Sequence, residues 1–273
     1  MWRRLRRREP FDVLPVEHGR AVAEAGIPYP NPRPYTDCSV VSVIWNEEAR
    51  IGNLLSHLQP YFRHIVVCVQ ASSDRSLTIA KRMAREGDVV LEDECRGFGE
   101  GSAPIVAPAV RTAWAFVVSA DEWPSDDLLE SVRTIIGYAG RHGYQGVWVP
   151  FRSTVEGVAF EEQRGQLRIF RRELGWSPTL HSRPRAGRSL FWPHGHVDHD
   201  RSLDEVVRDY LRYLDLGRGT PLLERHNTVM IREACTAVAA RYGWDYVTGR
   251  EWWPRAREAA FGARVPCAAN MVF

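Results

Sequence analysis

The chain has 273 residues, 44% of them hydrophobic, and a formal net charge of +2 at pH 7. This composition predicts a globular protein with a proper core, and the absence of any apolar run of about 18 residues excludes a membrane-spanning helix. The five cysteines lie far apart without CxxC spacing. They favour reduced thiols and an intracellular, cytoplasmic protein over a disulfide framework.

The first 37 residues are rich in Pro and Arg and predict an extended arm. Its Arg cluster could contact phosphates or anionic lipid headgroups, although a disordered, solubilising tail explains it as well. No apolar segment follows the cluster, so the pattern does not predict a secretory signal. Lys81 is the one lysine among 36 basic residues, and this bias weakens any argument that rests on Arg alone.

From Cys38 onward, strand and helix signals alternate along the chain. The β-branched run CSVVSVIW predicts a strand buried on both faces, and the segment after it has apolar residues at helical spacing with Asn46 as N-cap. More strands and helices follow in alternation. This order predicts an α/β protein with a mostly parallel sheet and helices on both faces. The further strands are expected at 64–70, 88–94 and 112–120, and the further helices at 72–87 and after Pro124.

Ligands of such sheets bind beyond the carboxyl ends of the strands. This rule brings three segments to one edge, 46–47, 70–74 and 119–122. In the last of them, the apolar run of FVVSADEW stops at two adjacent carboxylates, Asp121 and Glu122. A solvated turn is the alternative interpretation, but the neighbours at the same edge favour a site.

After residue 145 the pattern becomes mixed, which predicts a C-terminal region of both strands and helices. The segments 146–157 and 165–173 predict antiparallel strands, and a loop-rich stretch dense in His, Arg and Trp follows. A helix over 203–217 is expected to start at the N-cap Ser202, with Glu205 completing a capping box. A last helix is expected over 228–242, and the tail from residue 243 shows no clear pattern.

An acidic pair without a Cys/His cluster suits a hard cation, Mg²⁺ or Mn²⁺, which shares its coordination sphere with substrate phosphates. Such a metal can neutralise a departing diphosphate. The sequence has no GxxxxGK[ST] loop, and GFGEG at 97–101 does not follow a strand-to-helix turn, which disfavours kinases and dehydrogenases. The segment IWNEEAR also lacks the Gly-rich loop of nucleotidyltransferases.

Seven motifs, taken together and in order, resemble the GT-A-fold glycosyltransferases of family 2, particularly the branch containing lipopolysaccharide-core glucosyltransferases. The resemblance covers residues 38–216. The motifs are VIWNEEARI, VQASSDRSLTIAKRM, the GFG at 97–99, the strand end SADE, LRIFRRE, a turn at His181, and a His-rich loop before RSLDEVVRDYLRYL.

The resemblance implies an enzyme, a nucleotide-sugar-dependent hexosyltransferase that uses a UDP-sugar by family default. Residues 38–145 would be its nucleotide-sugar-binding half and 146–273 the acceptor-binding half of the same domain, after the arm 1–37. The implied roles follow residue by residue. Asn46 and Glu47 would line the nucleotide site, Asp74 with Gln70 would hold base and ribose, and Asp121 would bind Mn²⁺ or Mg²⁺ with His196 or His199.

The chain departs from the family pattern at several positions. Ser119 stands where the family has the first Asp of its Asp-x-Asp, and Gln70 replaces an Asp. The segment EGSAP replaces basic or amide residues, and His181 is followed by Ser182 instead of Glu. These changes put metal dependence and the UDP preference in question, and they motivate an alternative, a catalytically degenerate GT-A domain that binds a nucleotide sugar or a partner.

The catalytic base and the acceptor are the parts of the predicted reaction that the sequence defines least. Inverting transfer needs a carboxylate to accept the acceptor's proton, and the candidates are Glu156, then Glu122 and Asp198. The acceptor could be a saccharide, a virion protein or a hydroxymethylated base of phage DNA. The last idea comes from the Arg-rich segments and from a loose likeness of GFGEGSAP and LHSRP to transferases carried by bacteriophages, and it requires an extruded base.

Overall fold

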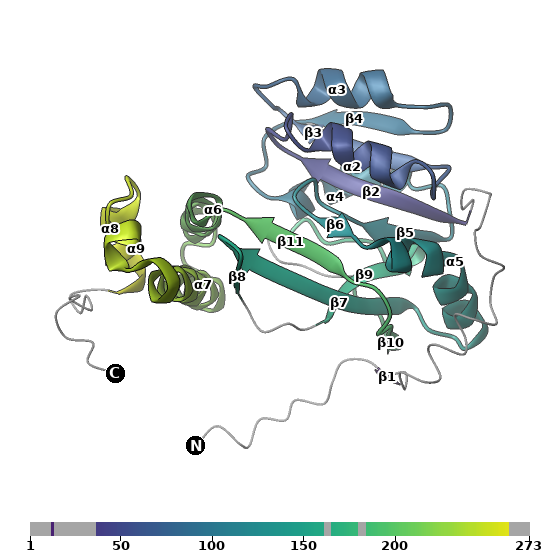
Figure 1. Cartoon of the computed structure of the whole chain (residues 1–273). Coiled ribbons are helices and arrows are strands. Elements are labelled where there is room, and N and C mark those ends of the chain that lie inside the picture. Colours follow the sequence, from purple (N-terminus) through teal and green to yellow (C-terminus); the bar gives the residue numbers. More distant parts are fainter. Residues whose placement is uncertain (1–11, 14–36, 161–164, 180–183, 262–273) are drawn as a thin grey trace. The chain divides into compact units, whose positions relative to one another are not determined.

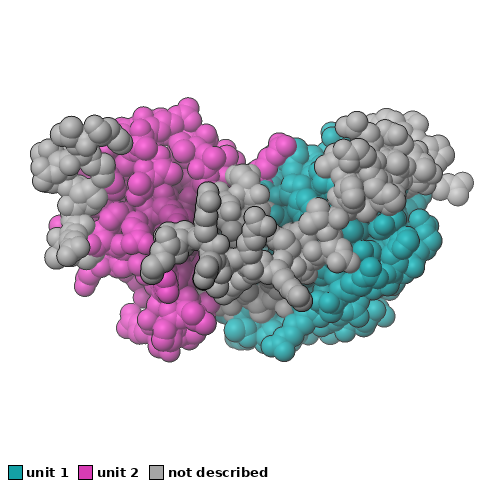
Figure 2. All heavy atoms as spheres, turned by 90° about the horizontal axis from the view of Figure 1, so that it is seen from below, with its two compact units in different colours: residues 1–151, 164–198 teal, residues 152–163, 199–273 magenta. Residues whose placement is uncertain are grey.

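The computed structural model describes residues 12–13, 37–160, 165–179 and 184–261. The chain divides into two compact units, which Figure 2 colours teal and magenta. Unit 1 comprises 1–151 and 164–198, and unit 2 comprises 152–163 and 199–273. Each unit has a hydrophobic core of its own. Within the predicted arm 1–37, only Asp12, Val13 and Asp37 are described.

Four parallel strands form the centre of unit 1, in the spatial order β4-β3-β2-β5 (Figure 1). Strands β2 and β3 are buried along almost their whole length, as their continuous apolar runs predict. The predicted mostly parallel sheet is therefore confirmed. The bounds are Cys38–Ile44 for β2, Ile65–Gln70 for β3, Val89–Asp93 for β4 and Trp114–Val117 for β5.

Helices cover both faces of these strands, as predicted. On one face, alternate strand residues such as Val40 and Phe116 belong to the same core cluster as the apolar sides of α2 (Ile51–Leu58), α3 (Ser76–Met83) and α5 (Asp126–Arg141). On the other face, Val41 and Ala115 pack with Val106 of α4 (Ala103–Ala109).

One helix was not predicted, and one local prediction is wrong. Helix α4, preceded by the short helix η1 (Gly99–Ser102), was not expected, because Pro104 and Pro108 look like helix breakers. Pro104 lies in the first turn, where its missing N–H is not needed, and Pro108 lies close to the C-terminal end. Asn46 is not the N-cap of α2: the cap residue is Arg50, and Asn46 has a left-handed φ of 55°.

Antiparallel strands extend the sheet beyond β5. Strand β9 pairs antiparallel with β7, as predicted, and it also pairs antiparallel with β5. Strand β7 pairs parallel with β10, which in turn pairs with β1. Strands β10 and β11 were missed because they are short, and the segment 192–196 between them contains Pro193 and Gly195. The bounds are β1 Asp12–Val13, β6 Trp123–Pro124, β7 Gly146–Val155, β8 Val158–Ala159, β9 Gly165–Arg171, η2 Arg172–Leu174, β10 Ser189–Phe191 and β11 Val197–Arg201.

The core of unit 2 is built mainly from helices. The expected capping box is confirmed: Ser202 accepts a hydrogen bond from the Glu205 backbone N–H, and the Glu205 side chain accepts one from Ser202. None of the helices in the described part of the chain is both long and apolar enough to cross a membrane. Helix α7 begins earlier than predicted, and helices α8 and α9 were not predicted. The bounds are α6 Leu203–Leu216, α7 Pro221–Tyr242, α8 Trp244–Thr248 and α9 Trp253–Ala260.

The four described cysteines are free thiols, in line with the sequence-based expectation. Cys38, Cys68 and Cys235 are buried, and Cys95 is exposed. Burial raises the pKa of Cys235 to about 12. The buried thiols therefore behave as small apolar side chains.

Gly195 is expected to be essential for the link between β11 and α5. Its φ is 75°, and a Cβ atom there would lie 2.5 Å from the Leu128 backbone nitrogen. Gly195→Ala should lower the free energy of unfolding by about 2–3 kcal/mol, as measured by urea denaturation. The matched control is Gly143→Ala, with a φ of 72° but no atom within 4 Å, which should cost about 1 kcal/mol. Equal losses in the two variants would contradict the predicted clash.

Candidate functional site

The strand order of unit 1 creates a switch point between β2 and β5. From β2 the chain moves outward through β3 and β4, and it then returns to add β5 on the other side of β2. The loops that leave the carboxyl ends of β2 and β5 therefore diverge, and ligands of open α/β sheets bind at such points. Asn46 and Glu47 follow β2, and Ser119, Asp121 and Glu122 follow β5.

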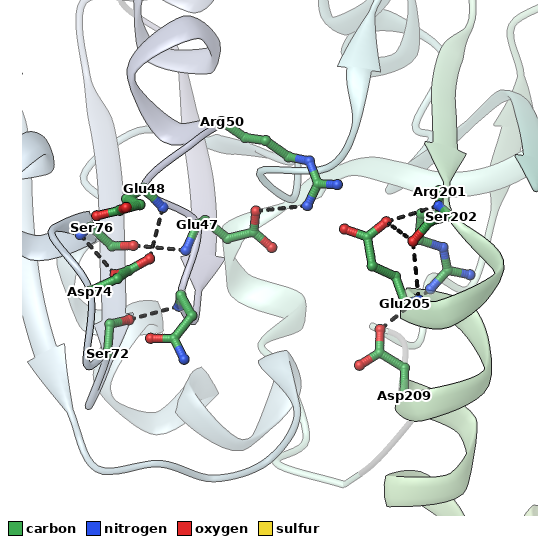
Figure 3. A network of polar contacts seen from close by, with 11 residues as sticks. Glu47, Glu48, Arg50, Ser72, Asp74, Ser76, Arg201, Ser202, Glu205 and Asp209 are labelled. Carbon is green, nitrogen blue, oxygen red and sulfur yellow. Dashed lines mark hydrogen bonds and ion pairs between the residues drawn. The ribbon is translucent and has the colours of Figure 1, made fainter. Parts of the chain in front are cut away.

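Hydrogen bonds join the loop after β2 to the loop after β3 (Figure 3). The backbone N–H of Asn46 donates to the Ser72 hydroxyl at 3.0 Å, and the Ser73 N–H donates to Asn46 Oδ1 at 2.8 Å. The Glu47 N–H donates to Ser76 Oγ at 2.7 Å. The two loops therefore form one rigid wall beside the switch point.

Two carboxylates complete this wall. Asp74 accepts the backbone N–H groups of Glu48, at 3.0 Å, and Ser76, at 2.9 Å. Burial alone would raise the pKa of Asp74, but the hydrogen bonds from Ser76 and Glu48 lower it below its usual value. Glu48 accepts the Arg75 backbone N–H at 3.0 Å and Nε at 3.1 Å, and these bonds lower its pKa. A ligand at Asp74 would have to use the remaining lone pairs.

Gln70 is 2% exposed and faces the protein interior. Its amide Nε2 donates to the Phe98 carbonyl at 2.9 Å and to Ser102 Oγ at 2.8 Å, which ties the segment after Gly97 to the sheet. The role of Gln70 in base recognition stays a prediction.

Asp93, at the end of β4, was not among the predicted site residues, although its position at a strand end is the signal that could have found it. Its side chain is 3% exposed and accepts hydrogen bonds from Ser102 Oγ at 2.8 Å and from Arg96 at 3.2 Å. Burial would raise the pKa of Asp93, but the bonds from Arg96 and Ser102 lower it. Asp93 is thus a buried, ionised anchor at this edge of the sheet.

Glu122 closes the turn that contains Asp121. Its carboxylate accepts the Ser119 N–H at 2.8 Å and a guanidinium N–H of Arg168, and its own N–H donates to the Ser119 carbonyl at 3.1 Å. The pair is buried: the Glu122 side chain is 5% exposed, and Arg168 lies over the Phe151 ring. Asp121, half-buried, is held at the centre of this locked turn.

The pairing of β6 with β11 brings His196 close to this turn. The His196 N–H donates to Ser125 Oγ at 3.0 Å, and its Nε2 lies 3.1 Å from Asp198 Oδ2. His199 belongs to unit 2. Within the described ranges, no group of three or more His, Cys, Asp and Glu side chains is arranged to hold a metal ion. The residues expected to bind the metal therefore do not form a ready set of ligands, and metal binding stays a prediction.

Glu156 lies in unit 2, in the two-residue turn between β7 and β8. Its φ is 51°, a conformation usually taken by Gly, Asn or Asp. Its Oε1 accepts the backbone N–H of Leu203, the first residue of α6, at 3.0 Å, so it caps this helix together with Ser202. Nearby in the same unit, Arg201 pairs with Asp209 at 3.5 Å (Figure 3). The role of Glu156 as a base stays a prediction.

Some predicted residues lie outside the described part of the chain. They are His181 and Ser182, and the Arg cluster of the N-terminal arm.

No protein-family model matches the chain, and no curated relative matches it. Solved structures give distant matches. S. aureus TarS 1-349 in complex with UDP-GlcNAc is 12% identical, with a TM-score of 0.47, 82% of this chain covered and 79% of that chain.

Glucosyl-3-phosphoglycerate synthase from Mycobacterium tuberculosis in complex with phosphoglyceric acid is 15% identical, with a TM-score of 0.40 and coverages of 76% and 88%. The same enzyme with Mn²⁺, UDP and phosphoglyceric acid is 17% identical, with a TM-score of 0.35 and coverages of 60% and 64%. Likenesses this distant do not carry a function from one protein to another. The α/β fold class follows from the strand pairing of this chain itself.

Asp93 should stabilise the fold in a pH-dependent manner. Because its folded pKa is lowered, its contribution is present above the unfolded pKa of about 3.9 and is lost as the pH falls through the folded value. Asp93→Asn should cost about 2 kcal/mol at pH 7, and this cost should fall progressively as the pH drops below about 3.9, as measured by urea denaturation. The exposed control Glu86→Gln should show no such dependence. A constant difference for Asp93→Asn across this range would contradict the assignment.

The Glu122–Arg168 pair should behave as a coupled unit. Arg168→Met and Glu122→Gln should each destabilise the fold by about 3 kcal/mol, because each leaves a buried partner uncompensated. The double variant should lose less than the sum of the two. A double-mutant cycle by urea denaturation measures this coupling, and additivity within about 0.5 kcal/mol would contradict it.

Proposed function

We propose that the chain is a glycosyltransferase, a hexosyltransferase that moves a sugar from a nucleotide-sugar donor to an acceptor hydroxyl with inversion. The observation that carries the proposal is the switch point between β2 and β5, where the strand-end motifs of the family resemblance meet at one edge of the sheet. The donor is assigned to this edge, with residues 38–145 as the donor half and 146–273 as the acceptor half.

The proposed donor-binding residues are held in place by the hydrogen bonds of the wall formed by the loops after β2 and β3. Asn46 and Glu47 are proposed to line the nucleotide site on the β2 side, held by their hydrogen bonds to the serines of the neighbouring loop. Asp74 and Gln70 are proposed to shape the base and ribose site, mainly through the segments that they hold in place. Preorganised loops reduce the entropy lost when a flexible donor binds.

Ser119 and Asp121 are proposed to face the diphosphate end of the donor, on the β5 side. A carboxylate beside a diphosphate needs a counter-charge, and Mg²⁺ or Mn²⁺ at Asp121 with His196 or His199 is the sequence-based expectation. The described side chains do not form a ligand set, so metal dependence is tested separately, by removing metal ions with EDTA.

The reaction itself is an in-line displacement. The acceptor hydroxyl attacks the anomeric carbon, its proton passes to a carboxylate, and the bond from the anomeric carbon to the diphosphate oxygen breaks. Glu156 is the first proposed base, because the Leu203 N–H fixes one of its oxygens. Asp198 is the second, held by His196. Glu122 is the weakest of the three, since both of its oxygens accept hydrogen bonds from within the protein.

A second candidate function is a GT-A domain that binds a nucleotide sugar or a partner without turnover. Two observations favour it: the Gln70 amide donates only to the protein's own Phe98 and Ser102 in the contacts described, and Ser119 stands where the family has a carboxylate. Measured turnover separates the two candidates.

Donor cleavage should depend on Asp121. Nucleotide release is measured from UDP-, GDP-, CDP- and dTDP-sugars, with Mn²⁺ or with EDTA. We expect release from one donor, and a rate at least about 100-fold lower for Asp121→Asn. Asp127→Asn, an exposed carboxylate on α5, is the control and should retain the rate. An unchanged rate in Asp121→Asn contradicts the assigned role, and no release from any donor by a folded wild type favours the binding module.

A further inference from the structure

Strand β6 pairs antiparallel with the first two residues of β11, and this β6–β11 ribbon, whose paired residues lie in unit 1, directly follows the turn 119–122 in the chain (Figure 1). Strand β11 also pairs with β7. Trp123 pairs with Asp198, and Pro124 pairs with Val197. The Ser125 N–H continues the register by donating to the His196 carbonyl at 2.8 Å. Residues opposite each other in an antiparallel pair share a face, and successive residues alternate between faces.

The two faces of the ribbon differ in burial as this alternation requires. Pro124 and Val197 are buried, and Val197 belongs to the core cluster of unit 1. On the other face, Trp123 is 44% exposed and the Asp198 side chain 47% exposed, with His196 at 21%. A large aromatic side chain therefore stands at the surface beside a carboxylate and an imidazole, all three on one face.

The indole of Trp123 is held in place although it is exposed. The His57 imidazole of α2 stacks on it, with ring centroids 4.0 Å apart and an interplanar angle of 15°. His57 is itself fixed, because its Nε2–H donates to the Pro124 carbonyl at 2.7 Å. A preordered aromatic surface loses little entropy when a ligand binds to it.

We propose that Trp123, His196 and Asp198 form the acceptor subsite, and that the acceptor is a saccharide. The apolar C–H face of a sugar ring packs on the indole, and the ring hydroxyls donate to the Asp198 carboxylate, which His196 orients from 3.1 Å. This inference rests on the glycosyltransferase function proposed above. Asp121 lies just before Trp123 in the chain, so the subsite adjoins the proposed reaction centre.

The charge of this region disfavours a nucleic-acid acceptor. Asp121, Asp126 and Asp198 lie on or next to the ribbon, and carboxylates repel a phosphate backbone. Of the two Arg-rich segments that suggested DNA, the N-terminal cluster lies outside the described residues, and the segment 181–189 is described only from residue 184. A neutral saccharide fits the observed groups better.

Direct binding tests the subsite. The wild type is titrated with maltotriose, cellotriose and chitotriose, followed by NMR, and the same titrations are repeated for Trp123→Ala, Trp123→Phe and Asp198→Asn. We expect at least one trisaccharide to bind, with a Kd about tenfold weaker for Trp123→Ala and a smaller loss for Trp123→Phe. Asp198→Asn should also weaken binding, because a neutral amide is a poorer acceptor than a carboxylate.

Trp45→Ala is the matched control. Trp45 is 42% exposed in the same unit but follows β2 and lies outside the ribbon, so its loss should leave the saccharide Kd unchanged. Unchanged binding in a folded Trp123→Ala, binding of none of the trisaccharides by the wild type, or binding only of hydroxymethylated duplex DNA would each overturn the inference. Donor release is measured separately, so failure of the transferase assignment is distinguishable from failure of the subsite.

Discussion

The parallel pairing of β2 with both β3 and β5 is the constraint on which the rest of unit 1 depends. Parallel neighbours bring the carboxyl ends of all these strands to one edge, and the connections between them must cross over as helices. Because the chain leaves β2 toward β3 on one side and later adds β5 on the other side, the loops after β2 and β5 diverge at that edge and leave a switch point between these two strands. Every residue assigned to the donor lies on the loops or strand ends around this point.

Most carboxylates at this edge hold the protein together. Asp74 joins two loops, Asp93 anchors Ser102 and Arg96, and Glu122 closes a turn against Arg168. Each accepts several hydrogen bonds, which keep the backbone around it rigid, and in Asp74 and Asp93 these bonds lower the pKa of the carboxylate. The turn that Glu122 closes holds Asp121, to which we propose to assign the donor end of the reaction, with the acceptor at the adjacent ribbon.

The parts of the fold that could be predicted are those encoded locally. The apolar runs of β2 and β3, the periodicity of α5 and the Ser202–Glu205 capping box need only neighbouring residues, and they match the structure. Helix α4 could not be predicted because tertiary packing overrides its two Pro residues, and strands β10 and β11 are too short to give a clear pattern of their own. The contacts of the site residues could not be predicted either. Arg168 donates to Glu122, which lies 46 positions away in the sequence. Asn46 does not cap α2 as expected, and its side chain accepts a hydrogen bond from the Ser73 N–H. Such pairings depend on which strands become neighbours, and no local pattern encodes that.

The most direct test of the account is the location of the bound nucleotide. Amide chemical shifts of the isotopically labelled chain are followed during titration with UDP, GDP, CDP and dTDP, with and without Mn²⁺. The account predicts that one nucleotide shifts the amides of Asn46 and Glu47 after β2 together with those of Ser119 and Asp121 after β5, the two sides of the switch point. Shifts confined to another surface, or no saturable shift with any nucleotide, would contradict the assignment of the donor site to this edge of the sheet.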